Sequence, residues 1–134
     1  MRLFVDANVF LRYFTLDDAG QHQRAARIFL EASRGDIDLV TGPPVLFEVA
    51  WTLQAAYRIP REKVLDVLAR ILALPGLALT DSQLVERALQ LARAGNRDFT
   101  DAYIAASAEA RGVDAVATFN RRDLQRLGSV IYDF

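Results

Sequence analysis

The chain has 134 residues, of which 52% are hydrophobic and 25% are charged, and its formal net charge is -1. This composition suits one folded domain, and it excludes both a disordered chain and a strongly basic one whose net charge alone would attract nucleic acid. Cysteine is absent and His22 is the single histidine, which excludes disulfides, thiolate metal sites and sites built from several histidines.

The N-terminal half alternates between short apolar runs and helical patterns. In chain order we expect a buried strand over 3–5, a short helix over 9–14, a helix from a cap at Asp17 or Asp18 to about Ser33, a strand over 38–41, and a helix from Pro43 to about Tyr57. Each strand is followed by at least one helix, which is the pattern of crossover connections between parallel strands.

The C-terminal half continues this alternation. We expect helices from Pro60 to about Leu72, from Asp81 or Ser82 to about Ala94, and over 99–111, and strands over 77–79, 115–118 and 130–132. The sequence therefore predicts an α/β fold: a central parallel sheet of four to five strands, covered by helices on both faces, in a single domain over residues 1–134.

The chain carries no signal for a membrane or for secretion. No apolar run approaches membrane-spanning length, and the N-terminus reaches an acid, Asp6, too soon for a secretory signal. We therefore expect a soluble cytoplasmic protein with no membrane partner.

Two polar residues follow predicted strands closely. Asp6 comes at the end of the strand over 3–5, and Asn120 stands two residues after the strand over 115–118. In parallel sheets the active site lies beyond the carboxyl ends of the strands, so we expect both side chains at that edge. The structural alternative is that each residue only forms a turn.

Three further acids fall on predicted helices. Glu48 is a single carboxylate in the otherwise apolar segment 45–51, and a buried carboxylate needs a partner. Asp98 and Asp101 are three residues apart and so share one face of a helix. On a purely structural interpretation, Glu48 would reach solvent or pair with an arginine, Asp98 would cap a helix, and Asp101 would be a first-turn acid.

These acids favour a particular class of metal. Oxygen ligands without histidine or cysteine suit Mg²⁺ or Mn²⁺, which neutralise phosphate charge and lower the pKa of bound water. Two carboxylates about 5 Å apart repel by roughly 3 kcal/mol at an effective dielectric constant of about 20. A cluster of three or four acids therefore implies a cation, shared protons or an arginine from a partner.

Four segments together resemble the PIN-domain family: residues 4–11 (FVDANVFL), 48–50 (EVA), 98–106 (DFTDAYIAA) and 118–124 (TFNRRDL). In order, they are similar to the family's opening strand and turn, its second acidic position, its most recognisable acidic segment and its closing motif. The likeness spans essentially the whole chain, in the right order and at suitable spacing.

The resemblance implies a three-layer α/β/α fold and a Mg²⁺- or Mn²⁺-dependent ribonuclease. By that likeness Asp6, Glu48 and Asp101 carry over as metal ligands and catalytic acids, with Asp98 as an extra acid near the site. Asn120 stands where many members have a fourth Asp, so it would offer a neutral oxygen ligand and leave a second metal in doubt. Many bacterial members are VapC-type toxins held inactive by an antitoxin protein.

Assembly and alternative functions complete the expectations. The apolar residues over 46–53, and the family likeness, predict a homodimer.

The main alternative to a ribonuclease is a PIN scaffold that binds RNA or protein without cleavage. A haloacid-dehalogenase-type phosphatase needs a second Asp where this chain has Asn8, a Rossmann domain needs a glycine-rich turn after the first strand, and a receiver domain needs a lysine near its end, whereas the single lysine is Lys63.

Overall fold

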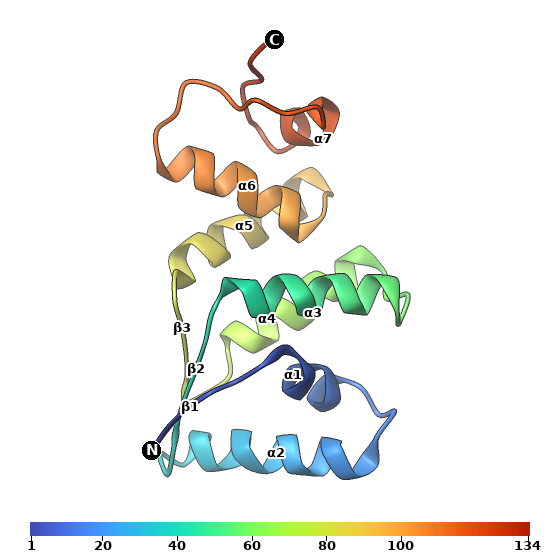
Figure 1. The fold of residues 1–134 in the computed structure, drawn as a ribbon, viewed down its shortest axis with the longest axis vertical. Coiled ribbons are helices and arrows are strands. Elements are labelled where there is room, and N and C mark those ends of the chain that lie inside the picture. The colour runs from blue at the N-terminus through green and yellow to red at the C-terminus, as the bar shows by residue number, and fades with distance from the viewer. The chain divides into compact units, whose positions relative to one another are not determined.

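The computed structural model describes residues 1–134, and the chain forms two units, Met1–Asp81 and Ser82–Phe134. The first contains, in order, β1 (Arg2–Phe4), α1 (Ala7–Phe14), α2 (Ala19–Ser33), β2 (Asp38–Thr41), α3 (Pro43–Ala55), α4 (Arg61–Leu72) and β3 (Leu77–Leu79). The second contains α5 (Ser82–Gly95), α6 (Phe99–Ala110) and α7 (Arg121–Arg126) (Figure 1). The expectation of a single domain over 1–134 stays a prediction.

The sheet of the first unit is parallel, with the strand order β1-β2-β3. Leu39 of β2 pairs in register with one leucine on each neighbouring strand and is almost completely buried. The next row along the strands contains Phe4, which is 66% exposed. Side chains alternate between the faces of a sheet, so one face carries the leucine row, with Leu39 buried at its centre, and the other carries Phe4.

The helices of this unit form where local signals place them. The carboxylate of Asp18 accepts a hydrogen bond from the backbone N–H of Gln21 at 2.9 Å, which caps α2. At its other end α2 packs closely against the turn that leads into β3. A Cβ atom on Gly76, whose φ is +79°, would lie only 2.4 Å from the carbonyl oxygen of Ala32. Gly76 therefore allows both the left-handed turn and the close approach.

In the second unit, α5 and α6 pack together. Both helices bury small side chains, among them Ala88 and Ala92 on α5 and Ala102 and Ala106 on α6. Small residues at a contact let two helices approach closely. Helix α7 follows, with Leu124 as its buried anchor.

The expectation of four to five strands is wrong, because the sheet has three strands. The segments over 115–118 and 130–132 contribute a single parallel bridge, Val116 with Ile131, held by hydrogen bonds of 2.8 and 2.9 Å. The first segment is rich in alanine, a weak strand former, and its Ala117 is exposed. The parallel α/β class is confirmed, and the three-layer arrangement stays a prediction.

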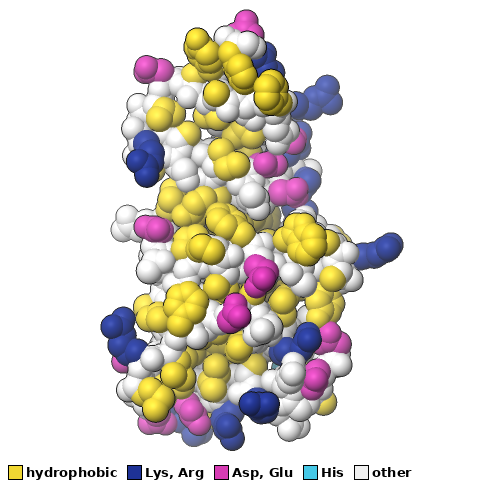
Figure 2. Space-filling view, viewed as in Figure 1, with side chains coloured by type: hydrophobic (Ala, Val, Ile, Leu, Met, Phe, Trp, Pro, Cys, Tyr) yellow, Lys and Arg dark blue, Asp and Glu magenta, His cyan; other side chains and the backbone are white.

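None of the helices has the length and apolar character needed to cross a membrane. On the face shown in Figure 2, hydrophobic side chains reach the surface beside Asp, Glu and Arg or Lys side chains. Exposed apolar residues alone therefore do not mark a functional site in this chain.

Candidate functional site

Asp6 lies directly beyond β1, at the point where the chain turns into α1. It is the N-cap of α1, and its Oδ1 accepts a hydrogen bond from the backbone N–H of Ala7 at 2.7 Å. The side chain is exposed and makes no ion pair with an arginine or lysine. The predicted position at the carboxyl edge of the sheet is confirmed, and the carboxylate keeps a free second oxygen.

The strand ends around Asp6 are fixed by a buried threonine. Thr41, fully buried at the end of β2, donates its hydroxyl hydrogen to the carbonyl of Val5 at 2.9 Å. The carbonyl of Thr41 in turn accepts from the backbone N–H of Thr80, just after β3, at 3.2 Å. The turn that carries Asp6 is therefore linked to the ends of both other strands. The role of Thr41 cannot be recognised from the sequence, because a lone threonine at a strand end has many ordinary roles.

Glu48 lies in the second turn of α3. Buried Val49 and Ala50 follow it, but the Glu48 side chain itself is exposed and has no hydrogen-bond or ion-pair partner in the protein. It therefore needs no compensating arginine, and the carboxylate is open to solvent and to any cation there.

Asp98 and Asp101 belong to the second unit, at the start of α6. Asp98 occupies the N-cap position, but its side chain makes no capping hydrogen bond. Asp101 lies in the first helical turn, and both side chains are half-buried. The capping interpretation of Asp98 is therefore wrong for the side chain, although the position is right. Both acids therefore lie at the end of α6 where the helix dipole places partial positive charge.

Asn120 occupies the N-cap position of α7 and is exposed. Its side chain makes no capping hydrogen bond, and its backbone N–H donates to the hydroxyl of Thr118 at 2.9 Å. Thr118 therefore shapes the turn, and the amide of Asn120 is not used to hold the helix.

Sequence reasoning missed an ion pair that fixes this part of the second unit. Arg97 donates from Nε to Asp123 Oδ1 at 2.6 Å, and its Nη1 donates to the carbonyl of Asn96 at 2.9 Å. The pair joins the residue before Asp98 to the first turn of α7, which begins after Asn120. It thereby holds the two candidate segments of the second unit in a fixed relation.

The candidate residues are divided between the two units. Asp6 and Glu48 belong to the first, and Asp98, Asp101 and Asn120 belong to the second. No group of three or more acidic or histidine side chains in the structure is arranged to hold a metal ion. The structure therefore does not show the predicted cluster of acids, and the set of metal ligands stays a prediction.

The chemistry of the individual donors nevertheless fits a hard divalent cation. The set consists of carboxylate and amide oxygens, which Mg²⁺ and Mn²⁺ prefer. Asp6 and Glu48 are exposed and carry no basic partner, so their charge is not neutralised within the protein. These two acids are available to an ion in a way that the paired Asp123 is not.

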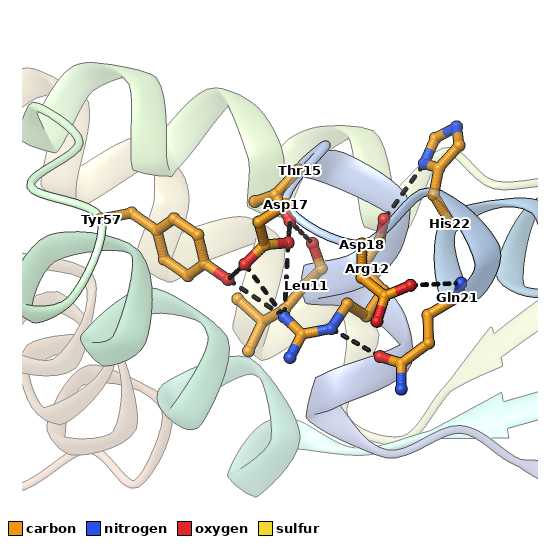
Figure 3. Close-up of polar contacts among 8 residues, drawn as sticks. All are labelled: Leu11, Arg12, Thr15, Asp17, Asp18, Gln21, His22 and Tyr57. Carbon is orange, nitrogen blue, oxygen red and sulfur yellow. Dashed lines mark hydrogen bonds and ion pairs between the residues drawn. The ribbon is translucent and has the colours of Figure 1, made fainter.

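A second polar network in the first unit was also missed (Figure 3). Tyr57 donates its hydroxyl hydrogen to Asp17 Oδ2 at 2.7 Å, and Arg12 Nη1 lies 3.3 Å from the same oxygen. The hydrogen bonds from Tyr57 and Thr15, and then the charge of Arg12, lower the pKa of the Asp17 carboxyl. Residues 45 positions apart meet here, which no local pattern could reveal.

The predicted homodimer rested on an apolar surface over 46–53, and the structure narrows that surface. Leu46, Ala50 and Leu53 are buried within the fold, while Trp51 is 69% exposed and Phe47 is half-buried. Trp51 therefore lies outside the core of the fold. The homodimer stays a prediction.

The comparison with known families gives one match over nearly the whole chain. No curated protein matches the chain. The model of the PIN domain matches residues 3–129, which covers both units and every candidate residue. The chain therefore belongs to the PIN-domain family and has its nuclease-type α/β fold.

Proposed function

We propose that the chain is a Mg²⁺- or Mn²⁺-dependent ribonuclease in which Asp6, Glu48 and Asp101 are the metal ligands. Asp98 and Asn120 would add oxygen donors around the same ion. The observation that carries the proposal is Asp6: an exposed carboxylate at the end of a parallel strand, without a basic partner, in a chain that the PIN-domain model matches over 3–129.

The local structure of Asp6 suits a ligand. Its Oδ1 is held by the N–H of Ala7, which restricts the carboxylate to one orientation, while Oδ2 has no partner. A ligand held in this way loses little side-chain freedom when an ion binds. Thr41 and the strand ends fix the turn itself.

The acids of the second unit are placed in a favourable electrostatic setting. Asp101 lies in the first turn of α6 and Asp98 at its cap position, where the helix stabilises negative charge. When bound, the metal would neutralise phosphate charge and lower the pKa of an attacking water. The proposal requires that acids from both units serve the same reaction.

The proposal extends to a toxin of a toxin–antitoxin pair. Its support is the likeness of the four motifs to VapC-type members, and an arginine on an antitoxin protein would neutralise the exposed carboxylates of Asp6 and Glu48. A small neighbouring gene that encodes a DNA-binding protein with an arginine-bearing tail would support this role.

The alternative is a PIN scaffold that binds RNA or protein without cleavage. Two observations favour it: Asn120 replaces a possible fourth acid, and no group of three acids is arranged around one point. The scaffold and the ribonuclease differ in one measurable respect, which is metal-dependent cleavage.

The test is single-turnover cleavage of a set of structured RNAs in Mn²⁺, in Mg²⁺ and in EDTA. Asp6→Asn removes the charge but keeps the helix cap, because Asn caps as well as Asp. We expect the parent to cleave RNA in Mn²⁺ and not in EDTA. The cleavage rate of Asp6→Asn should be lower than that of the parent by roughly 100-fold or more.

Asp36→Asn is the matched control, because Asp36 is an exposed acid of the same unit outside the candidate set. Its cleavage rate should equal that of the parent. Cleavage by Asp6→Asn at the parent rate would refute the ribonuclease proposal. RNA binding by the parent without any metal-dependent cleavage would favour the scaffold.

A further inference from the structure

A pocket of about 480 Å³ lies between α1 and α2 and is lined by basic and amide side chains. Arg12 and Asn8 come from α1, and Gln21, Arg24 and Arg27 come from α2; apolar residues of both helices complete the lining. No acidic side chain lines it. We call this the arginine pocket. Its size falls in the range of about 300–1,000 Å³ that suits a bound small molecule or one unit of a polymer.

The charge of the arginine pocket is only partly neutralised. Arg12 is paired with Asp17, which stands outside the lining. Arg24 and Arg27 are exposed, and neither makes a hydrogen bond or an ion pair with the protein. Two unpaired guanidinium groups at one pocket attract an anion, and their planar donors match phosphate oxygens in pairs.

The wall formed by Arg12 is held in place before any ligand binds. Arg12 Nε donates to Gln21 Oε1 at 2.6 Å, and Arg12 Nη1 donates to the hydroxyl of Tyr57 at 3.1 Å. Figure 3 shows that this contact turns the amide nitrogen of Gln21 away from Arg12. The pocket therefore offers an oriented amide donor beside its cations.

The position of the pocket relates it to the proposed reaction. Asn8 is two residues beyond Asp6, in the first turn of α1, and an α-helix rises about 1.5 Å per residue. The pocket and Asp6 therefore share the N-terminal turn of α1, within reach of one RNA strand. Amide side chains such as Asn8 and Gln21 both donate and accept, as recognition of a ribose hydroxyl or a base edge requires.

We propose that the arginine pocket binds the phosphate–ribose backbone of single-stranded RNA beside the position of cleavage. This inference rests on the proposed ribonuclease function and adds a substrate subsite to it. A single strand fits better than a duplex, because the pocket holds only about 480 Å³ between α1 and α2, which suits one unit of a strand. Arg24 and Arg27 contact phosphate, and Arg12 with Gln21 forms the fixed wall.

The test measures binding separately from cleavage. A fluorescent single-stranded oligoribonucleotide is titrated with the full chain in EDTA, between 50 and 200 mM salt, and anisotropy is recorded for the parent, Arg24→Gln, Arg27→Gln and the double variant. Each loss of a phosphate contact should weaken binding several-fold and reduce the slope of log K against log salt by about 0.7. For the double variant, the slope of log K against log salt should fall by about twice as much.

Arg34→Gln is the control, because Arg34 is exposed at the end of the same helix, outside the pocket, and the change in charge is identical. It should bind RNA as the parent does. If Arg34→Gln weakened RNA binding as much as the pocket variants do, or if the parent did not bind RNA, the proposal that the arginine pocket binds RNA would be wrong. Pocket variants that bind RNA normally but lose a poly-glutamate peptide would identify a peptide site and also overturn it.

The outcomes separate the pocket from the reaction. RNA binding that depends on Arg24 and Arg27, without metal-dependent cleavage, supports the pocket and refutes the ribonuclease. Cleavage that depends on Asp6, with pocket variants that bind and cleave as the parent does, refutes the pocket alone. Circular dichroism of each variant confirms that the chain is folded.

Discussion

The carboxylates at the two ends of α1 have opposite surroundings. At the N-terminal end, Asp6 is exposed and has a single hydrogen bond, from the N–H of Ala7. Beyond the C-terminal end, Asp17 accepts from Tyr57 and lies beside Arg12 and Thr15 (Figure 3). The two acids belong to the same unit and flank one helix of eight residues.

The difference shows which acid is structural. The charge of Asp17 is matched within the protein, and the pKa of its carboxyl is lowered by hydrogen bonds from Tyr57, just beyond α3, and from Thr15, and then by the charge of Arg12 in α1. Asp6 is exposed to water and has no counter-charge within the protein, so its carboxylate is available to a cation from solution. An added cation should therefore act at the Asp6 end of α1, and the loss of a hydrogen bond to Asp17 should act only at the other end.

The largest effect should come from metal at the Asp6 end. An ion that binds only the folded state raises its free energy of unfolding by about 2.7 kcal/mol when the ion is a hundredfold above Kd, or roughly 5–15 °C in Tm. We expect this rise for the parent in Mn²⁺ and for Asp17→Asn, but not for Asp6→Asn. Thermal melts in EDTA, Mg²⁺, Mn²⁺ and Ca²⁺ measure it. Equal rises in all three proteins would contradict the assignment of Asp6.

A smaller effect should follow from added charge in the second unit. Asn120→Asp would place a carboxylate at the start of α7, where no capping bond occupies the side chain. If Asn120 is a ligand, the variant should bind Mn²⁺ roughly 3- to 10-fold more tightly, because affinity rises with the number of charged ligands. Calorimetric titration of both proteins decides this, and identical Kd values would make Asn120 a turn residue.

At the other end of α1, the hydroxyl of Tyr57 should contribute stability only. Tyr57→Phe removes the donor to Asp17 and an acceptor of Arg12 Nη1. We expect the Tm to fall by roughly 2–4 °C, with the rise in Mn²⁺ unchanged. If Tyr57→Phe lost the rise in Tm caused by Mn²⁺, the network around Asp17 would affect the metal site, and the assignment of a purely structural role to Tyr57 would be wrong.

The smallest effect concerns pH. The pKa of Asp17 is lowered from its ordinary value of 3.8, first because Tyr57 donates to it and then because of Thr15 and Arg12. Its contribution to stability is therefore fully present above pH 4 and is lost as the pH falls through the lower, folded-state pKa. Carboxyl chemical shifts in NMR should show Asp17 titrating below the ordinary value of 3.8, and Tyr57→Phe should raise the pKa of Asp17. A pKa that does not move in this variant would contradict the network.

Local signals in the sequence predicted the first unit well. The strand over 38–41 and a helix cap at Asp17 or Asp18 follow from short-range patterns, and the structure has the strand and uses Asp18 as the cap. The contacts that fix the unit were not predictable in this way. Arg12 meets Tyr57, and Thr41 reaches Val5, through pairings that depend on the fold as a whole.

The second unit shows where such signals fail. A strand needs a partner with which to pair, and residues 115–118 and 130–132 contribute only the bridge between Val116 and Ile131. Helix α7 has six residues and was too short to show a periodic pattern. Asp6 could be placed from the end of its strand, whereas the joint role of the acids came from the family motifs and not from local physics.

The central claim is that acids of both units serve one metal-dependent reaction, and a double-mutant cycle tests it most directly. Single-turnover RNA cleavage in Mn²⁺ is measured for the parent, Asp6→Asn, Asp101→Asn and the double variant, with Asp36→Asn and Asp114→Asn as exposed controls from each unit. Each site variant should lose roughly 100-fold or more in rate, and the double variant should lose little beyond the worse single one, because residues that act as a unit are not additive. Losses that multiply to roughly 10,000-fold, or parent-like cleavage by either single variant, would contradict the claim.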